Sequence, residues 1–195
     1  MTDITPDLYA DYARIAEDIA ENADMGDQMR LRRYCRNTHN MEVLGSGISR
    51  TGFDYDGRVV FKVVTGYQEQ AANEVTFFLD HQDDKRFAQI IYWTADFSVV
   101  VMEKIEHRLL SEQQWEDWRD NNWHASGIIP TQLSERRTAF VEELTQDYPA
   151  PYSDWCCLLS DLHWDNIRVR DSGEWVVIDY GSGPDASKSP HKHIL

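Results

Sequence analysis

The sequence lacks an apolar run long enough to cross a membrane, and it lacks a secretion signal at its N-terminus. A membrane-spanning helix needs about 20 mostly apolar residues, whereas charged residues make up 27% of this chain and are spread along it. A secretion signal needs an apolar stretch behind a basic N-terminus. We therefore expect a soluble protein of the cytoplasm with no membrane partner.

Positive charge is also scarce. The chain has 19 Lys and Arg residues against 34 Asp and Glu residues, which gives a formal net charge of −15. Proteins that bind nucleic acid neutralise its phosphates with Lys and Arg side chains, so this balance argues against a nucleic-acid partner. An acidic surface favours either solubility or a basic partner.

Cysteine is present but fits neither a metal site nor a disulfide framework. Cys35, Cys156 and Cys157 follow no ligand spacing typical of zinc, and an odd number cannot all pair within one chain. Reduced thiols of a cytosolic protein are the simplest interpretation. A chain of 195 residues that is 42% hydrophobic can bury a core as one domain or as two small lobes.

The residues that can carry chemistry are concentrated near the end of the sequence. Asp161 and Asn166 lie in one polar loop, and Asp179 follows two β-rich runs over 167–170 and 174–178. An Asp-Ser-Gly turn between these runs predicts a hairpin, which would bring Asp179 back beside Asn166. Carboxylate and amide oxygens suit Mg²⁺. Asn166 and Asp179 are therefore candidate metal ligands, which leaves Asp161 to orient or deprotonate an attacking hydroxyl group.

A second informative stretch, 41–64, is typical of three strands joined by a glycine-containing turn and an Asp-Gly turn. Gly45 and Gly47 would let the backbone approach a phosphate group closely and present N–H groups to it. Lys62 lies inside an apolar run, where a purely structural lysine is costly. Together these residues indicate a phosphate-binding strand-turn-strand unit.

These motifs resemble those of the protein-kinase-like fold. The family's catalytic loop reads HRDxxxxN and its metal-binding motif reads DFG; this chain has Leu159-Ser160-Asp161 with Asn166, and then Asp179-Tyr180-Gly181. The form Asp161-Leu162-His163 resembles both aminoglycoside phosphotransferases and the small protein kinases of some tailed bacteriophages. The resemblance implies that Asp161 is the catalytic base and that Asn166 and Asp179 hold Mg²⁺.

The same resemblance implies an ATP site in the first half of the chain. Lys62 would hold the α- and β-phosphates, and a carboxylate on the following helix, expected over 67–80, would hold Lys62 in place. Glu74 is the preferred partner because it lies mid-helix beside the apolar face. Glu69, in the first turn of that helix, is the alternative.

The resemblance also extends to the adenine edge and the transferred phosphate. Met102 aligns with the gatekeeper residue, and the backbone of Glu103 and Ile105 would meet the adenine edge. His163 takes the place of a lysine that touches the transferred phosphate. Contact with the substrate and a structural role in the loop are both open for His163, because an imidazole carries less charge than a lysine at neutral pH. ATP and Mg²⁺ are the implied cofactors.

The chain departs from the family pattern in two places. Arg50 stands where the third glycine of GxGxxG would lie, and Gly52 could serve instead in a lengthened loop. Ser160 replaces the arginine of HRD, and few residues follow Gly181. We therefore expect an enzyme that is active as made and needs no phosphorylation of an activation loop.

The predicted fold class is α+β, a protein-kinase-like two-lobe fold with an antiparallel N-lobe sheet and a truncated helical C-lobe. We expect an N-terminal helical extension over 1–40, the N-lobe over 41–105, and a minimal C-lobe with a short tail over 106–195. Helices are expected over 6–22, 27–38, 67–80, from Ser111 onward and over 134–147.

Three functional hypotheses follow from the sequence. The first is a serine/threonine protein kinase of the bacteriophage type, which would act on host proteins or on itself in the host cytoplasm. The enzymatic alternative is an aminoglycoside-like small-molecule phosphotransferase, since cationic substrates suit an acidic surface. The third is an acidic pseudokinase that binds a host protein without chemistry, but the retained Lys62, Asp161, Asn166 and Asp179 argue against it.

Overall fold

The computed structural model describes residues 4–121, 128–148 and 162–181, so that Asp161, Cys156 and Cys157 lie outside the described residues. In chain order the elements are α1 (Pro6–Asn22), α2 (Gln28–His39), β1 (Glu42–Ser46), β2 (Arg50–Asp54), β3 (Val59–Val64), α3 (Glu69–Asp80), β4 (Ile90–Trp93), β5 (Val99–Glu103), β6 (His107–Arg108), α4 (Glu112–Asp120), α5 (Thr131–Asp147), β7 (Ile167–Val169) and β8 (Trp175–Val177).

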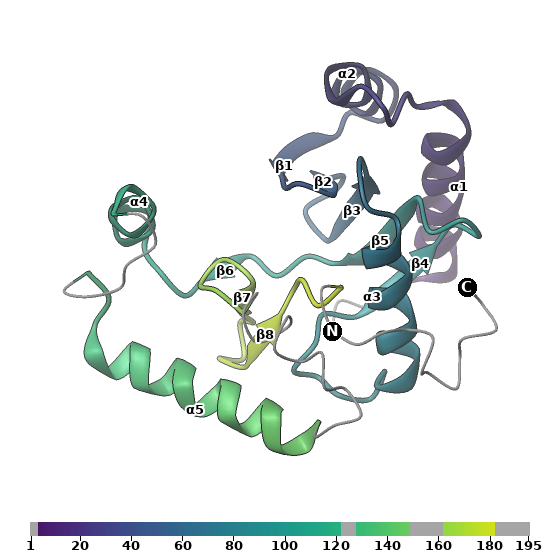
Figure 1. The fold of residues 1–195 in the computed structure, drawn as a ribbon. Coiled ribbons are helices and arrows are strands. Elements are labelled where there is room, and N and C mark those ends of the chain that lie inside the picture. The colour runs from purple at the N-terminus through teal and green to yellow at the C-terminus, as the bar shows by residue number, and fades with distance from the viewer. Residues whose placement is uncertain (1–3, 122–127, 149–161, 182–195) are drawn as a thin grey trace.

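A five-stranded antiparallel sheet with the order β1-β2-β3-β5-β4 forms the first lobe (Figure 1). Side chains alternate between its two faces, as the pleat of a strand requires. In β3, Val59, Phe61 and Val63 pack into the core beneath the N-terminal helices. Val60 and Val64 belong to the opposite core, on the face from which Lys62 enters a cavity. One strand therefore supplies both a hydrophobic core and a functional face.

Helix α1 covers the outer face of the sheet, over the residues predicted for it. Its stripe buries Tyr12, Ile15 and Ile19 in the same core as β3 and β5. Thr5 caps the helix by accepting a hydrogen bond from the Leu8 N–H. The hydrophobic core on the outer face of the sheet is thus completed by side chains of α1.

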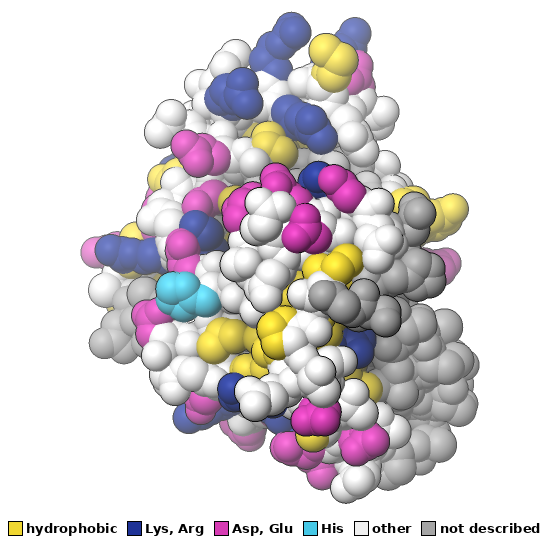
Figure 2. Space-filling model, turned by 90° about the vertical axis from the view of Figure 1, so that its left-hand side faces the viewer, with side chains coloured by type: hydrophobic (Ala, Val, Ile, Leu, Met, Phe, Trp, Pro, Cys, Tyr) yellow, Lys and Arg dark blue, Asp and Glu magenta, His cyan; other side chains and the backbone are white. Residues whose placement is uncertain are grey.

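Helix α2 follows α1 and forms one end of the molecule. Its four arginines make this end basic although the chain as a whole is acidic (Figure 2). Cys35 is buried on its inner side, where burial raises the pKa of the thiol to about 12. This cysteine is therefore a neutral thiol at physiological pH, as expected for a reduced structural cysteine.

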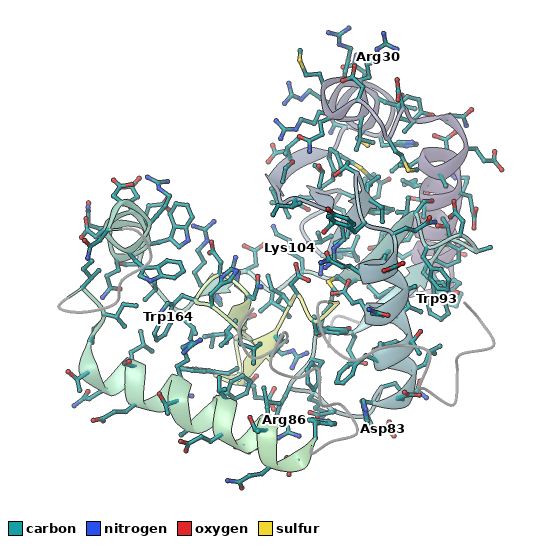
Figure 3. All side chains as sticks on the ribbon, viewed as in Figure 1. Arg30, Asp83, Arg86, Trp93, Lys104 and Trp164 are labelled. Atoms are coloured by element: carbon teal, nitrogen blue, oxygen red, sulfur yellow. The ribbon has the colours of Figure 1, made fainter. Side chains whose placement is uncertain are left out.

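The segment between α3 and β4 contacts the second lobe. Phe87 forms a bridge to Val177 of β8, and the Ala88 N–H donates to the Val177 carbonyl at 2.9 Å. Beside this bridge, Arg86 pairs with Asp147 of α5 at 2.6 Å (Figure 3). The core around Phe77, Phe87 and Tyr180 then packs both lobes together.

The remaining elements of this lobe are the sheet β6-β7-β8 and the helices α4 and α5. The predicted capping box at Ser111 and Gln114 is present at the start of α4. The predicted start of the next helix at Ser134 is wrong, because α5 begins at Thr131. Pro130 occupies its N-cap position, where a fixed φ and a missing N–H cost no helical hydrogen bond. Strand β6 was not predicted.

The predicted α+β, protein-kinase-like class is confirmed by this architecture. An antiparallel sheet with a helix between its third and fourth strands forms one lobe, and a smaller lobe carries the hairpin of β7 and β8. Within the described ranges, no helix is long and apolar enough to cross a lipid bilayer.

Candidate active site

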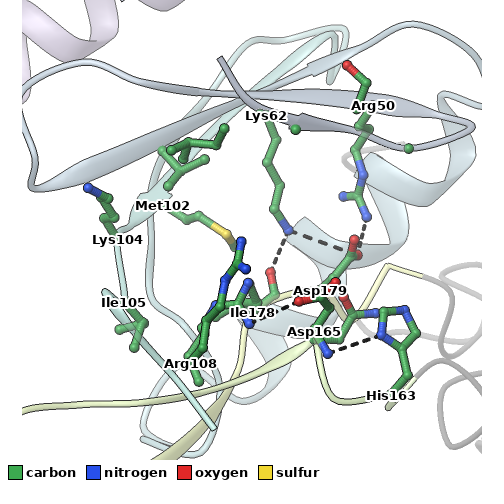
Figure 4. Close-up of a pocket in the computed structure, with 18 of the residues that line it drawn as sticks. Arg50, Lys62, Met102, Lys104, Ile105, Arg108, His163, Asp165, Ile178 and Asp179 are labelled. Carbon is green, nitrogen blue, oxygen red and sulfur yellow. Dashed lines mark hydrogen bonds and ion pairs between the residues drawn. The ribbon is translucent and has the colours of Figure 1, made fainter. Parts of the chain in front are cut away.

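A cavity of about 850 Å³ lies between the sheet of the first lobe and the β7–β8 hairpin of the second (Figure 4). It gathers most of the residues that the sequence singled out. From the first lobe these are Gly45, Gly47, Lys62, Met102, Glu103 and Ile105; from the second they are His163, Asn166 and Asp179.

Lys62 and Glu74 form a buried ion pair at the inner end of this cavity. Lys62 Nζ lies 2.8 Å from Glu74 Oε1 and donates to the Ile178 carbonyl at 2.6 Å. The Glu74 side chain is fully buried, whereas Glu69 lies on the exposed end of α3. Of the two glutamates proposed as partners for Lys62, the structure pairs it with Glu74. A buried lysine needs such compensation, because an unpaired charge is costly away from water.

The predicted hairpin brings Asn166 and Asp179 together. Ile167 pairs with Val177, and the Ile178 N–H donates to the Asn166 carbonyl at 2.9 Å. Asp179 then follows directly and lines the same cavity as Asn166. Two side chains that are distant in sequence are therefore placed on one wall of the cavity.

Arg50, which stands where the third glycine of the pattern was expected, also enters this site. Its Nη1 lies 2.5 Å from Glu74 Oε2, and its Nη2 is ion-paired with Asp179 Oδ1. Burial by itself would raise the pKa of the Asp179 carboxyl, but the charges of Lys62 and Arg50 outweigh that effect and lower it. Asp179 is therefore ionised at neutral pH.

The donor set fits one hard divalent cation. Asn166 and Asp179 supply oxygen atoms on one wall of the cavity, and Mg²⁺ is usually bound by one or two protein oxygens together with phosphates and water. In the described portion of the chain, no group of three or more His, Cys, Asp or Glu side chains comes together. An all-protein cage for a metal is therefore not formed by these residues.

The glycine turn forms the roof of the cavity. A Cβ atom added at Gly45 would meet no protein atom within 4 Å, and at Gly47 it would meet only the Arg50 carbonyl at 3.9 Å. The turn is closed by a hydrogen bond from the Gly47 N–H to the Arg50 carbonyl at 2.8 Å. Packing within the chain does not require these glycines, so the space above them is open to a ligand. Gly52, the suggested substitute for the third glycine, lies within β2.

Met102, Glu103 and Ile105 line the cavity around the end of β5. Met102 is buried, and β5 ends at Glu103, so that the chain leaves the sheet where Ile105 lines the cavity. The Glu103 side chain is occupied elsewhere, since its Oε1 accepts a hydrogen bond from the Gln89 N–H at 2.9 Å. Any contact of Glu103 with an adenine ring would therefore involve its backbone, as expected from the sequence.

His163 lies at the entrance between α4 and the hairpin. Its Nδ1 accepts a hydrogen bond from the Asp165 N–H at 3.2 Å, and its ring centroid lies 6.2 Å from that of Trp118. In the neutral ring this bond assigns the proton to Nε2. His163 lines the cavity and also holds the loop, so the geometry retains both roles left open by the sequence.

Two further arginines on the cavity wall were missed by the sequence analysis. Arg108 and Arg168 come from β6 and β7, and both line the cavity. The signal in the sequence was weak, because Arg108 belongs to a two-residue strand and Arg168 alternates with apolar residues in a strand pattern.

No protein-family model matches the chain, and no curated protein matches it. Several solved structures resemble it. The GDP complex of aminoglycoside 2′-phosphotransferase-IIIa is 14% identical, with 81% of this chain and 74% of that chain covered and a TM-score of 0.42. A Mycobacterium tuberculosis protein in complex with erythromycin is 15% identical, with 95% and 58% covered and a TM-score of 0.46.

A choline/ethanolamine kinase family protein from Mesorhizobium loti is also 15% identical, with 90% of this chain and 66% of that chain covered and a TM-score of 0.43. Likenesses of this size do not identify a reaction or a substrate. The chemistry of this chain therefore has to be inferred from its own cavity.

Proposed function

We propose that the chain is an ATP-dependent phosphotransferase that uses Mg²⁺ and acts on a hydroxyl group. The observation that carries this proposal is the buried Lys62–Glu74 pair facing Asp179 in one cavity with an open glycine turn. A lysine held in this way can bind phosphate oxygens, and the turn can present backbone N–H groups to them. Catalysis of this kind needs positioning and charge neutralisation more than covalent chemistry.

Each residue has a proposed part in the reaction. Lys62, held by Glu74, binds the α- and β-phosphates, while Asn166 and Asp179 orient the metal-bound triphosphate. Asn166 and Asp179 would hold Mg²⁺, which would neutralise charge that develops on the phosphate oxygens. Asp161, which lies outside the described residues, is proposed to orient the acceptor hydroxyl and take its proton.

The remaining cavity residues recognise the ends of the nucleotide and the transferred group. The backbone of Glu103 and Ile105, next to Met102, is proposed to meet the adenine edge. The Nε2–H of His163, assigned by the hydrogen bond at Nδ1, is proposed as a donor to the transferred phosphate.

The acceptor that we propose is a serine or threonine of a protein, either a host protein or this chain itself, as in the bacteriophage-type kinases that the catalytic loop resembles. An aminoglycoside-like acceptor is the alternative when no protein is labelled.

The test is incubation of the purified chain with γ-labelled ATP, Mg²⁺ and a bacterial lysate. Label on lysate proteins or on the chain, lost in both Asp161→Ala and Asp179→Ala, is the expected result. Nucleotide turnover with aminoglycosides but no labelled protein would instead support the small-molecule alternative.

A second candidate is favoured by one observation. Arg50 is ion-paired with Asp179, the proposed metal ligand, and balances its charge, as would suit a pseudokinase that binds a host protein and performs no chemistry. Nucleotide binding without turnover on any acceptor would support this candidate over the phosphotransferase.

A further inference from the structure

Arg50 brings a permanent positive charge to the carboxylate proposed to hold the metal. It is the first residue of β2, directly after the glycine turn, and only 7% of it is exposed. Its guanidinium group points into the cavity and contacts carboxylates from two different elements, Glu74 of α3 and Asp179 after β8 (Figure 4). A guanidinium does not lose its proton in proteins, so this charge is always present.

The charges around Arg50 already balance. Glu74 and Asp179 supply two negative charges, and Lys62 and Arg50 supply two positive charges within 4.0 Å of them. In a site with the lysine alone, one carboxylate would remain for metal ions to neutralise. Here Arg50 balances the charge of that carboxylate. These four side chains therefore carry no net charge before any cation binds.

The geometry also limits how a metal can reach Asp179. Arg50 and Lys62 both approach the same oxygen, Oδ1. A cation at Oδ1 would have to displace Arg50 from that oxygen. A single ion at Oδ2 needs no such displacement.

Arg50 is also held firmly in this position. If it left, the fully buried Glu74 would keep, among the residues that the structure describes, only Lys62 and the Tyr180 N–H, which lies 3.3 Å from Glu74 Oε1. Breaking one side of a buried ion pair is costly because it leaves a charge uncompensated. The contact between Arg50 and Glu74, and with it the position of the guanidinium group beside Asp179, is therefore expected to persist when a ligand enters.

From these contacts we propose that Arg50 takes the electrostatic place of a second metal ion, so that the site binds its nucleotide with a single divalent cation. The inference rests on the proposed phosphotransferase function and specifies its metal requirement. The guanidinium fork lies directly after the phosphate-binding turn and suits phosphate oxygens as well as carboxylates. It would supply charge at the triphosphate that other sites of this kind obtain from a metal.

The test counts bound metal without measuring activity. Mn²⁺ is titrated into the full chain with a non-hydrolysable ATP analogue, and free Mn²⁺ is measured by electron paramagnetic resonance. We expect one Mn²⁺ per bound nucleotide in the wild type. Arg50→Gln is expected either to bind a second Mn²⁺ or to lose at least tenfold in nucleotide affinity at one equivalent of Mn²⁺, whereas Arg50→Lys keeps the single-metal stoichiometry.

Arg86→Gln is the matched control, because it removes another ion-paired arginine that does not line this cavity. It should leave the Mn²⁺ count unchanged. Circular dichroism shows whether each variant folds. If Arg50→Gln does not fold, the number of Mn²⁺ ions bound per nucleotide by the wild type still tests the inference.

Two Mn²⁺ ions per nucleotide in the wild type would overturn the inference alone. So would an Arg50→Gln protein with unchanged stoichiometry and affinity, or one that binds the nucleotide more tightly. A wild-type chain that binds no nucleotide at any Mn²⁺ concentration would overturn the proposed function as well. This outcome is distinguishable from the others, in which the nucleotide binds and only the number of metal ions or the affinity differs.

Discussion

Arg108 and Arg168 lie directly opposite each other on the antiparallel strands β6 and β7, and both line the cavity. Like charges in this relationship destabilise a sheet. Arg168 has Asp165 at 3.6 Å, but its buried Nη1 makes no hydrogen bond among the described residues. Arg108 stacks over Trp115 at 5.0 Å. Among the described residues, Arg168 is thus a poorly paired cation beside the proposed nucleotide site, whereas the exposed Arg108 keeps its contact with water.

Replacing Arg168 with Met should therefore cost the unliganded protein little stability. Burial lowers the pKa of Arg168, and the charge of Arg108 adds to this effect while Asp165 opposes it. Because Arg168 Nη1 makes no hydrogen bond to Asp165 among the described residues, Arg168→Met gives up little pairing energy and relieves the repulsion from Arg108 across the strand pair. We expect the free energy of unfolding to change by less than about 1 kcal/mol, measured by urea denaturation, while nucleotide affinity falls.

Arg170 is the matched control for this prediction. It lies two positions further along the chain but is ion-paired with the largely buried Glu103. Arg170→Met should lower the free energy of unfolding by about 1–3 kcal/mol, because it leaves a partly buried carboxylate without its partner. Equal losses in the two variants would contradict our interpretation of Arg168.

Removing the Glu74 carboxylate should destabilise the protein strongly. Glu74→Ala leaves Lys62 and Arg50 buried without their shared partner, and such a change costs about 3–5 kcal/mol. Glu69→Ala on the same helix removes an exposed carboxylate and should change the free energy of unfolding by less than about 0.5 kcal/mol. Urea denaturation of both variants checks the prediction, and a small loss for Glu74→Ala would refute it.

Gly181 should tolerate no side chain. A Cβ atom at this position would lie 2.3 Å from the Gln70 carbonyl oxygen and 3.2 Å from Arg50 Nη2. Because the obstacle is backbone, Gly181→Ala has to shift α3 or the segment after β8, and overpacking of this kind costs about 1–3 kcal/mol. Thermal unfolding should show this loss for Gly181→Ala but little change for Gly45→Ala, whose Cβ would meet no protein atom.

Gly45→Ala then tests the site in a different way. Its added methyl group should weaken nucleotide binding without unfolding the chain, since Gly45 lines the cavity roof. Unchanged nucleotide affinity in Gly45→Ala would argue against close approach of a phosphate to this turn.

The contribution of Asp84 to stability should depend on pH. Burial would raise the pKa of its carboxyl, but hydrogen bonds from Arg86 and Tyr148 outweigh burial and lower it. The folded pKa therefore lies below the unfolded value of about 3.9. The stabilisation is fully present above that value and is lost as the pH falls through the folded pKa.

Asp84→Asn removes this contribution, so the stability difference between it and the wild type should be constant above about pH 5 and should shrink below about pH 4. Urea denaturation over this range measures the difference. The neighbouring Asp83 is exposed, and Asp83→Asn should show no comparable trend. A difference that stays constant down to pH 3 would show that the Asp84 carboxyl is not stabilised in its ionised form.

Local patterns were sufficient to predict several elements of the fold. The apolar spacing of Tyr12, Ile15 and Ile19 predicted α1 over the range that it occupies. The β-rich runs and turn that precede Asp179 predicted the β7–β8 hairpin and its approach to Asn166. These predictions succeeded because side-chain periodicity and turn chemistry act between residues that are close in sequence. The predicted start of α5 was wrong because the helix begins directly after Pro130, whose fixed φ suits the N-cap position, and not at Ser134.

The sequence by itself determined the residue types that the proposed chemistry needs and the order in which the chain presents them. Lys62 in an apolar strand and Asp179 after a hairpin were recognisable without coordinates. Only the tertiary structure decided that Arg50 bridges Glu74 and Asp179, because this contact joins three elements separated by as many as 129 positions in sequence. Such a pairing depends on burial and side-chain direction, which a single local pattern does not encode.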